Sequence, residues 1–141
     1  MISANYCIQE YVPPTIFKQF GEMSIWFIDQ RIVLFNEWLS EYCGVKAIVN
    51  DWHKGGQYHD SGFRDPLASI GAPHGQHFYG RATDSKVPEQ DYEVLRDLIR
   101  SNFKSLNARF GITTIEKDTP TWLHVDTRWT GLDHLFECNF K

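Results

Sequence analysis

A histidine and an aspartate able to bind a metal ion stand seven residues apart in the segment 77–84, HFYGRATD. On an uninterrupted strand this odd separation would point His77 and Asp84 to opposite faces. The two side chains converge only where the backbone bends between them, and Gly80 is the residue that permits a bulge or a turn. A shared role for the pair therefore predicts a bend at Gly80.

A second polar segment follows at 121–128, TWLHVDTR. Its polar and apolar residues nearly alternate, as they do in a half-buried strand, which places His124 and Asp126 on one face. If that face meets His77 and Asp84, two histidines and an aspartate surround a point with a free fourth position. Proteins hold a catalytic zinc ion with three such ligands and an open position.

The segment 50–76 lies just before the first of these motifs and has no sustained periodicity, because glycine and proline interrupt it throughout. A loop of this length within a compact domain is commonly functional. It carries His53, His59 and His74, which we expect near the mouth of the site as loop histidines.

Flanking this loop, the pattern of apolar residues predicts the elements that must position the site. Asp29 is a suitable N-cap and Gly44 a suitable C-terminal glycine for one helix, and Pro88 suits the first position of another. The predicted helices cover 15–21, 29–42 and 88–110, and the predicted strands cover 45–49, 112–116 and 121–128. These elements predict an α+β fold with a small antiparallel sheet and helices packed on one face.

Composition narrows the function classes. The chain has 141 residues, of which 42% are hydrophobic and 23% charged, which fits one ordered domain over 1–141 rather than a disordered chain. A net charge of −4 argues against binding nucleic acid by phosphate neutralisation. No apolar run is long enough for a membrane helix. Cys7, Cys43 and Cys138 are widely spaced, which predicts buried, reduced thiols rather than a disulfide framework.

Three motifs occur in a fixed order along the chain: SGFR at 61–64, then His77, Gly80, Ala82 and Asp84, then His124 with Asp126. This set resembles the zinc D-Ala-D-Ala carboxypeptidase family, which is related in fold to the hedgehog signalling domain. That family carries an S-G-Y-R element, an S-x-H-x-x-G-x-A-x-D element and a late H or H-x-D strand. With NDWHKGG at 50–56, the chain looks most like small peptidase-like proteins of bacteriophages and prophages.

The resemblance implies roles for individual residues. His77, Asp84 and His124 would be the zinc ligands. Arg64 would hold a substrate carboxylate or the developing oxyanion, a role that suits its planar guanidinium group. Ser61 and Trp52 are the other candidate substrate contacts, with Trp52 alternatively a lid of the core.

The chain departs from the family pattern at two positions. Gly75 replaces the serine that usually stands two residues before the first histidine ligand. Thr121 stands where many members have the catalytic carboxylate, three residues before the last histidine, and a threonine cannot act as the base. Glu116, Asp126 and Asp118 are the candidate replacements, with Glu116 slightly favoured over Asp126.

The resemblance implies a hydrolase, specifically a zinc metallopeptidase that cleaves stem peptides of bacterial peptidoglycan. The bond would be D-Ala-D-Ala, as in carboxypeptidases, or L-Ala-D-Glu, as in some phage endolysins. We expect a monomer that binds neither nucleic acid nor membrane. Since residues 1–14 show no signal peptide and 141 residues leave no room for a wall-binding domain, we expect a cytoplasmic protein that reaches the cell wall after release.

Two alternatives belong to other classes. The first is a zinc-binding but inactive structural module of the same fold, such as a virion or tail component. The second is a metal-free scaffold whose histidines are incidental.

Overall fold

A computed structural model describes residues 1–68, 71 and 74–140, and over them the chain forms one small α+β domain. None of the helices within these residues combines the length and apolar character needed to span a membrane. The helices are α1 (Pro14–Phe20), α2 (Gln30–Cys43), α3 (Tyr92–Ser101) and α4 (Phe103–Phe110). The strands are β1 (Ala82–Ser85), β2 (Thr114–Glu116), β3 (Leu123–Asp126) and β4 (Phe136–Cys138).

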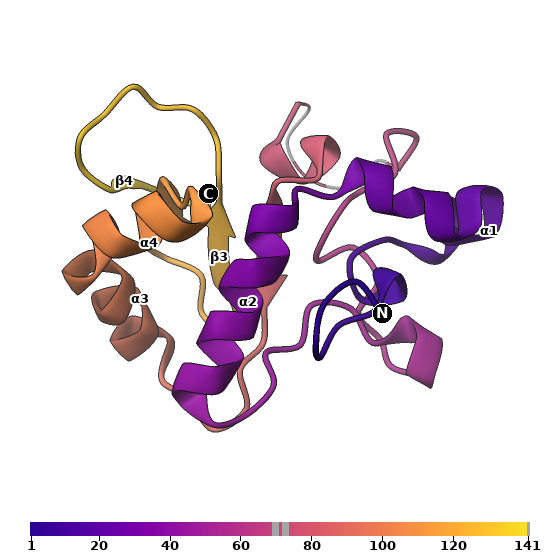
Figure 1. Cartoon of the computed structure of the whole chain (residues 1–141), viewed down its shortest axis with the longest axis horizontal. Helices are drawn as coiled ribbons and strands as arrows, with labels where there is room; N and C mark the ends of the chain where they lie inside the picture. The colour runs from indigo at the N-terminus through magenta and orange to yellow at the C-terminus, as the bar shows by residue number, and fades with distance from the viewer. Residues whose placement is uncertain (69–70, 72–73, 141) are drawn as a thin grey trace.

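Helix α2 begins and ends where its capping residues predict. The Asp29 carboxylate accepts a hydrogen bond from the backbone N–H of Arg31, and Gly44 adopts a left-handed conformation with φ 67°. Phe35 and Leu39 are fully buried in the core, whereas Tyr42 is 62% exposed and does not continue the buried stripe. Figure 1 shows α2 running in front of the strands, with α3 and α4 on one side of it and α1 on the other.

The single helix predicted over 88–110 is instead two helices. Pro88 lies in a turn, and α3 begins only after Asp91, whose carboxylate accepts hydrogen bonds from two backbone N–H groups of the first turn. The break falls at Asn102, where the side-chain amide donates to the carbonyl of Leu98. Such local side-chain bonds compete with the helix ladder, which explains the interruption.

The four strands form one sheet in the order β1-β3-β2-β4. Strand β3 pairs antiparallel with β1 and β2, but β2 and β4 pair in parallel, so the prediction of an antiparallel sheet is wrong at this edge. The strand predicted over 45–49 is also wrong, because only one isolated bridge joins Ile48 to Lys86. The segment 50–76 has no strand in its described residues, only 3-10 turns at Trp52–Lys54 and from Gln76.

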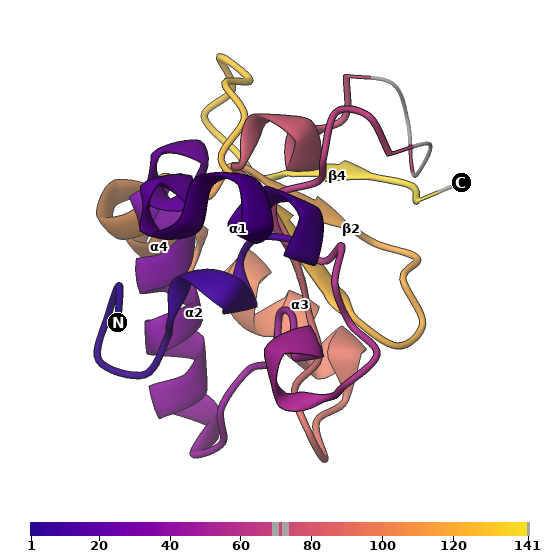
Figure 2. The ribbon, with the colours of Figure 1, turned by 90° about the vertical axis from the view of Figure 1, so that its right-hand side faces the viewer.

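The two faces of the sheet have different surroundings. Val125, Leu123 and Ile115 are buried on one face in the core formed with α2, α3 and α4. Their neighbours in sequence, His124 and Glu116, therefore point to the opposite face. Figure 2 shows α2 and α4 on one side of β2 and β4. The helices thus cover one face and leave the other for polar side chains.

Candidate metal centre

His77 comes from the 3-10 turn Gln76–Tyr79, which ends at Gly80 just before β1. Gly80 has φ 68°, and a Cβ atom at this position would lie 1.5 Å from the carbonyl oxygen of Phe27. Only glycine fits there, and the bend predicted at Gly80 is confirmed. His77 is 5% exposed, and its Nδ1 lies 2.8 Å from the carbonyl oxygen of Gly62, so Nδ1–H donates and Nε2 is left free.

His124 and Asp84 come from adjacent strands, because the register of β1 and β3 pairs these two residues directly. The Nδ1 atom of His124 lies 2.8 Å from Asp84 Oδ1. Its Nε2 atom lies 3.0 Å from Asp126 Oδ2, on the same strand face. In each histidine, one ring nitrogen therefore lies against an oxygen: Nδ1 of His77 against the carbonyl of Gly62, and Nε2 of His124 against Asp126. The other ring nitrogen of each histidine faces Asp84.

His77, Asp84 and His124 form a group that we call the sheet site. One ligand atom from each residue lies within 4.8 Å of the others. His77 Nε2 is 3.3 Å from Asp84 Oδ2. Two nitrogen or oxygen ligands of a tetrahedral zinc ion, each at about 2.0–2.1 Å from it, lie roughly 3.4 Å apart. The spacing of this pair and the donor types suit a divalent metal ion, whereas His124 Nδ1 and Asp84 Oδ1, 2.8 Å apart, stand at hydrogen-bond distance.

The charges of the group are strongly coupled. Burial acts to raise the pKa of Asp84, but its contacts with His77 and His124 outweigh burial and hold that pKa well below its usual range. Burial acts to lower the pKa of His124, but its bonds to Asp126 and Asp84 raise it to about 10.

Glu116, at the end of β2, is the carboxylate next to this group. Its Oε1 atom lies 3.8 Å from His124 Nδ1, and its side chain is 17% exposed at the wall of the pocket. Burial raises the pKa of Glu116. Glu116 makes no hydrogen bond or closer ion pair among the described residues, which leaves its carboxylate available.

Asp126 differs from Glu116 in both burial and hydrogen bonding. It is fully buried, and its two oxygens accept hydrogen bonds from Arg128 Nε and Nη2 at 2.9 and 2.6 Å. One of these oxygens also faces His124 Nε2. A carboxylate that holds the far nitrogen of a ligating histidine fixes its tautomer and orientation. This arrangement suits a positioning residue better than a base.

Arg64 reaches the same pocket from the loop. Its Nη2 atom lies 3.3 Å from Asp84 Oδ2, and its Nε–H donates to the carbonyl of Asp60. The pocket has a volume of about 400 Å³ and is also lined by Arg128 and Phe140. Two guanidinium groups, each paired with a carboxylate, therefore stand beside the candidate metal group.

Several predicted residues lie away from the pocket lining. Trp52 packs against Phe17 and donates to the carbonyl of Val12, as a core lid does. Ser61 instead supports the site, because its carbonyl accepts a hydrogen bond from the backbone N–H of Asp84. Asp118 accepts a hydrogen bond from the backbone N–H of Phe140.

Of the three loop histidines, only His74 lines the pocket. His59 pairs with Asp60 at 2.6 Å, and His53 lies beside Cys7. Sequence reasoning also missed Cys138, which lines the pocket from β4. That strand is only three residues long, which is too short for an alternation of apolar and polar residues to identify it.

In comparisons with known proteins, no family model, curated protein or solved structure matches this chain.

Proposed function

We propose that the chain is a zinc-dependent peptidase with a hedgehog/DD-peptidase-like fold that hydrolyses an amide bond of bacterial peptidoglycan stem peptides. The observation that carries the proposal is the arrangement of the sheet site. His77 and His124 each have one nitrogen held by an oxygen and the other directed at Asp84, with Glu116 beside them. The proposed substrate class rests on the ordered motifs and on the two arginines of the pocket.

His77 Nε2, Asp84 and His124 Nδ1 would hold the zinc ion. When bound, zinc supplies Lewis-acid chemistry by acidifying water and polarising an amide carbonyl. The protein contributes orientation, because Gly62 and Asp126 fix the tautomers of the two rings.

Glu116 is the proposed catalytic base. Its carboxylate accepts a proton from water at an oxygen and returns that proton to the nitrogen of the departing amine. Among the described residues lining the pocket, only Glu116 and Asp84 carry carboxylates, and Asp84 is committed to the two histidines. The bonds of Asp126 to Arg128 and His124 favour Glu116 over Asp126 in this role.

Arg64 is the proposed partner of a substrate carboxylate or of the developing oxyanion. A guanidinium group offers paired donors that match a carboxylate. The stem peptide ends in a carboxylate when D-Ala is removed, and it carries one beside the bond when L-Ala-D-Glu is cut. Arg64 would suit the carboxylate of either substrate, and the experiment therefore includes both.

The test uses purified protein with at least two equivalents of zinc and two substrates, a stem peptide ending in D-Ala-D-Ala and intact peptidoglycan. We expect mass spectrometry to detect free D-Ala from the stem peptide, or fragments of peptidoglycan cut between L-Ala and D-Glu. His77→Ala and His124→Ala should abolish zinc binding at the sheet site and abolish cleavage. Full activity in a metal-free preparation would contradict the proposal.

Glu116→Gln separates the enzyme from an inactive zinc-binding module. It should retain zinc and lose activity by about 10²–10⁴-fold, the usual contribution of a general base. Glu41→Gln, at an exposed position of α2, is the matched control and should retain activity. A wild-type protein that binds zinc but cleaves neither substrate would instead support the virion or structural role.

A further inference from the structure

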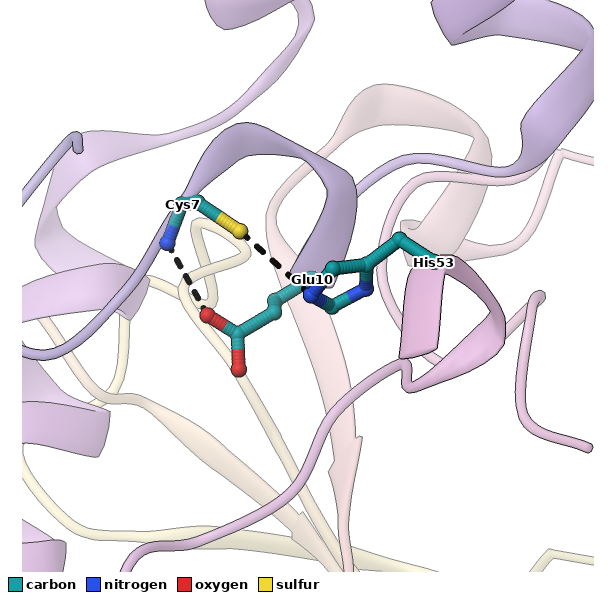
Figure 3. A group of neighbouring side chains, drawn as sticks. All are labelled: Cys7, Glu10 and His53. Carbon is teal, nitrogen blue, oxygen red and sulfur yellow. Dashed lines mark hydrogen bonds between the residues drawn. The ribbon is translucent and has the colours of Figure 1, made fainter. Parts of the chain in front are cut away.

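A second group of metal-binding side chains lies outside the sheet site. Cys7 and Glu10 flank the 3-10 turn Ile8–Glu10, and His53 comes from the turn Trp52–Lys54. One ligand atom from each of the three lies within 4.8 Å of the others. Figure 3 shows the three side chains converging from these two turns. We call this group the turn site.

We propose that the turn site binds a second divalent ion, with Zn²⁺ as the preferred metal, through Cys7 Sγ, His53 Nε2 and the Glu10 carboxylate. The measured distance between Cys7 Sγ and His53 Nε2 is 3.6 Å. With Zn–S at about 2.3 Å and Zn–N at about 2.0–2.1 Å, two tetrahedral ligands lie roughly 3.6 Å apart. The pair is therefore already spaced as zinc ligands are.

Burial and hydrogen bonds hold Glu10 in place. Glu10 is 5% exposed, its Oε2 accepts a hydrogen bond from the backbone N–H of Cys7 at 2.9 Å, and its Oε1 pairs with Lys46 at 2.5 Å. A carboxylate oxygen has two lone pairs, so an oxygen that accepts one hydrogen bond can also bind a metal. Glu10 is thus an oriented ligand rather than a mobile surface acid.

The donor set selects the metal. A thiolate with an imidazole and a carboxylate suits zinc and other borderline or soft ions, whereas magnesium and calcium prefer oxygen ligands alone. The Cys7 thiol loses its proton to solvent as the sulfur binds the ion, because the thiolate is the ligand. Three protein ligands leave the fourth position to water.

The ion would tie together two segments that support the sheet site. The backbone N–H of Asn50 donates to the carbonyl of Glu10, and the Asn50 side-chain oxygen accepts from the N–H of Ser61. The carbonyl of Ser61 in turn accepts from the N–H of Asp84. The turn site therefore lies at one end of a chain of hydrogen bonds that ends at a ligand of the sheet site.

Cobalt substitution tests the proposal because a thiolate bound to Co²⁺ gives an intense sulfur-to-metal charge-transfer band in the near ultraviolet. We expect this band in wild-type protein, its loss in Cys7→Ser and its persistence in Cys43→Ser. Cys138→Ser is the essential control, because Cys138 lines the pocket of the sheet site, and it too should retain the band. A wild-type protein without the band, or a band that survives in Cys7→Ser, would overturn the proposal.

Zinc stoichiometry gives an independent measurement. Elemental analysis should find two zinc ions per wild-type chain, one in either Cys7→Ser or His77→Ala, and none in the double variant. Circular dichroism checks that Cys7→Ser is folded. If it is not, His53→Gln replaces it as the variant that removes a ligand of the turn site. Lys46→Met should tighten binding at the turn site several-fold, because the Lys46 ammonium repels a cation beside Glu10. One zinc ion per chain in both wild type and Cys7→Ser would refute the second site.

Discussion

At the scale of the residue, the geometry of the sheet site depends on residues outside the candidate ligand group itself. Asp126 holds His124 Nε2 at 3.0 Å while Arg128 holds Asp126 with two hydrogen bonds. The carboxylate of Asp126 and the imidazole of His124 are buried, so these bonds hold the His124 ring in one orientation. His77 has an equivalent anchor in the carbonyl of Gly62. Ligand identity and ligand orientation are thus encoded by different residues.

Asp126→Asn tests this division. The amide keeps the shape of the side chain but weakens the bond to His124, so we expect zinc affinity at the sheet site to fall by about 10–100-fold, as for other residues that orient ligands. A competition titration with a fluorescent chelator measures the change. Asp118→Asn is the control and should bind zinc as wild type does. If Asp126 were the base rather than a positioning residue, its amide variant would keep wild-type zinc affinity and lose only turnover.

At the scale of the element, the site depends on one sharp bend between a 3-10 turn and β1. Gly80 has a left-handed φ of 68° and also approaches the carbonyl of Phe27 closely, so two features require glycine there. Gly44 shares only the left-handed conformation. Gly44 has φ 67°, but no atom lies within 4 Å of a Cβ built there. The two glycines are therefore a matched pair that separates backbone strain from steric clash.

Gly80→Ala should lower the free energy of unfolding by more than Gly44→Ala does. Left-handed backbone alone costs an alanine about 1–2 kcal/mol, which is the expected effect at Gly44. At Gly80 the added methyl group also displaces the segment around Phe27 or the turn that carries His77, so zinc affinity should fall as well. Urea unfolding and zinc titration measure the two effects. Equal losses of stability for the two variants would show that the close approach to Phe27 is unimportant.

The elements that sequence reasoning predicted are those defined by local signals. The caps Asp29 and Gly44 delimit α2, and the alternation around His124 identifies β3. Strand β4 and the turn site depend instead on contacts between distant segments. Cys7 and His53 are 46 residues apart, and no spacing rule relates them before the chain has folded.

At the scale of the whole molecule, the helices and the site occupy opposite faces of a thin sheet. Strands β1, β2 and β3 supply Asp84, Glu116 and His124 to one face. On the other face, β2 and β3 bury apolar side chains in the core formed with α2, α3 and α4, whereas β1 turns the polar Thr83 and Ser85 toward Asn36 of α2. A metal ion bound at the open face would therefore link strands whose opposite face belongs to the core. Because ligands come from segments as far apart in the chain as His77 and His124, an ion bound there stabilises the folded state and not the unfolded chain.

Zinc should therefore raise the melting temperature, and the Cys7→Ser variant isolates the contribution of the sheet site. At a free zinc concentration about 100 times the dissociation constant, binding to the folded state alone adds about 2.7 kcal/mol. For a domain of this size that corresponds to a rise of roughly 8 °C. Differential scanning calorimetry of Cys7→Ser with zinc and with a chelator measures the rise, and His77→Ala in the same background should abolish it. An unchanged melting temperature at saturating zinc would mean that His77, Asp84 and His124 do not act together as one site.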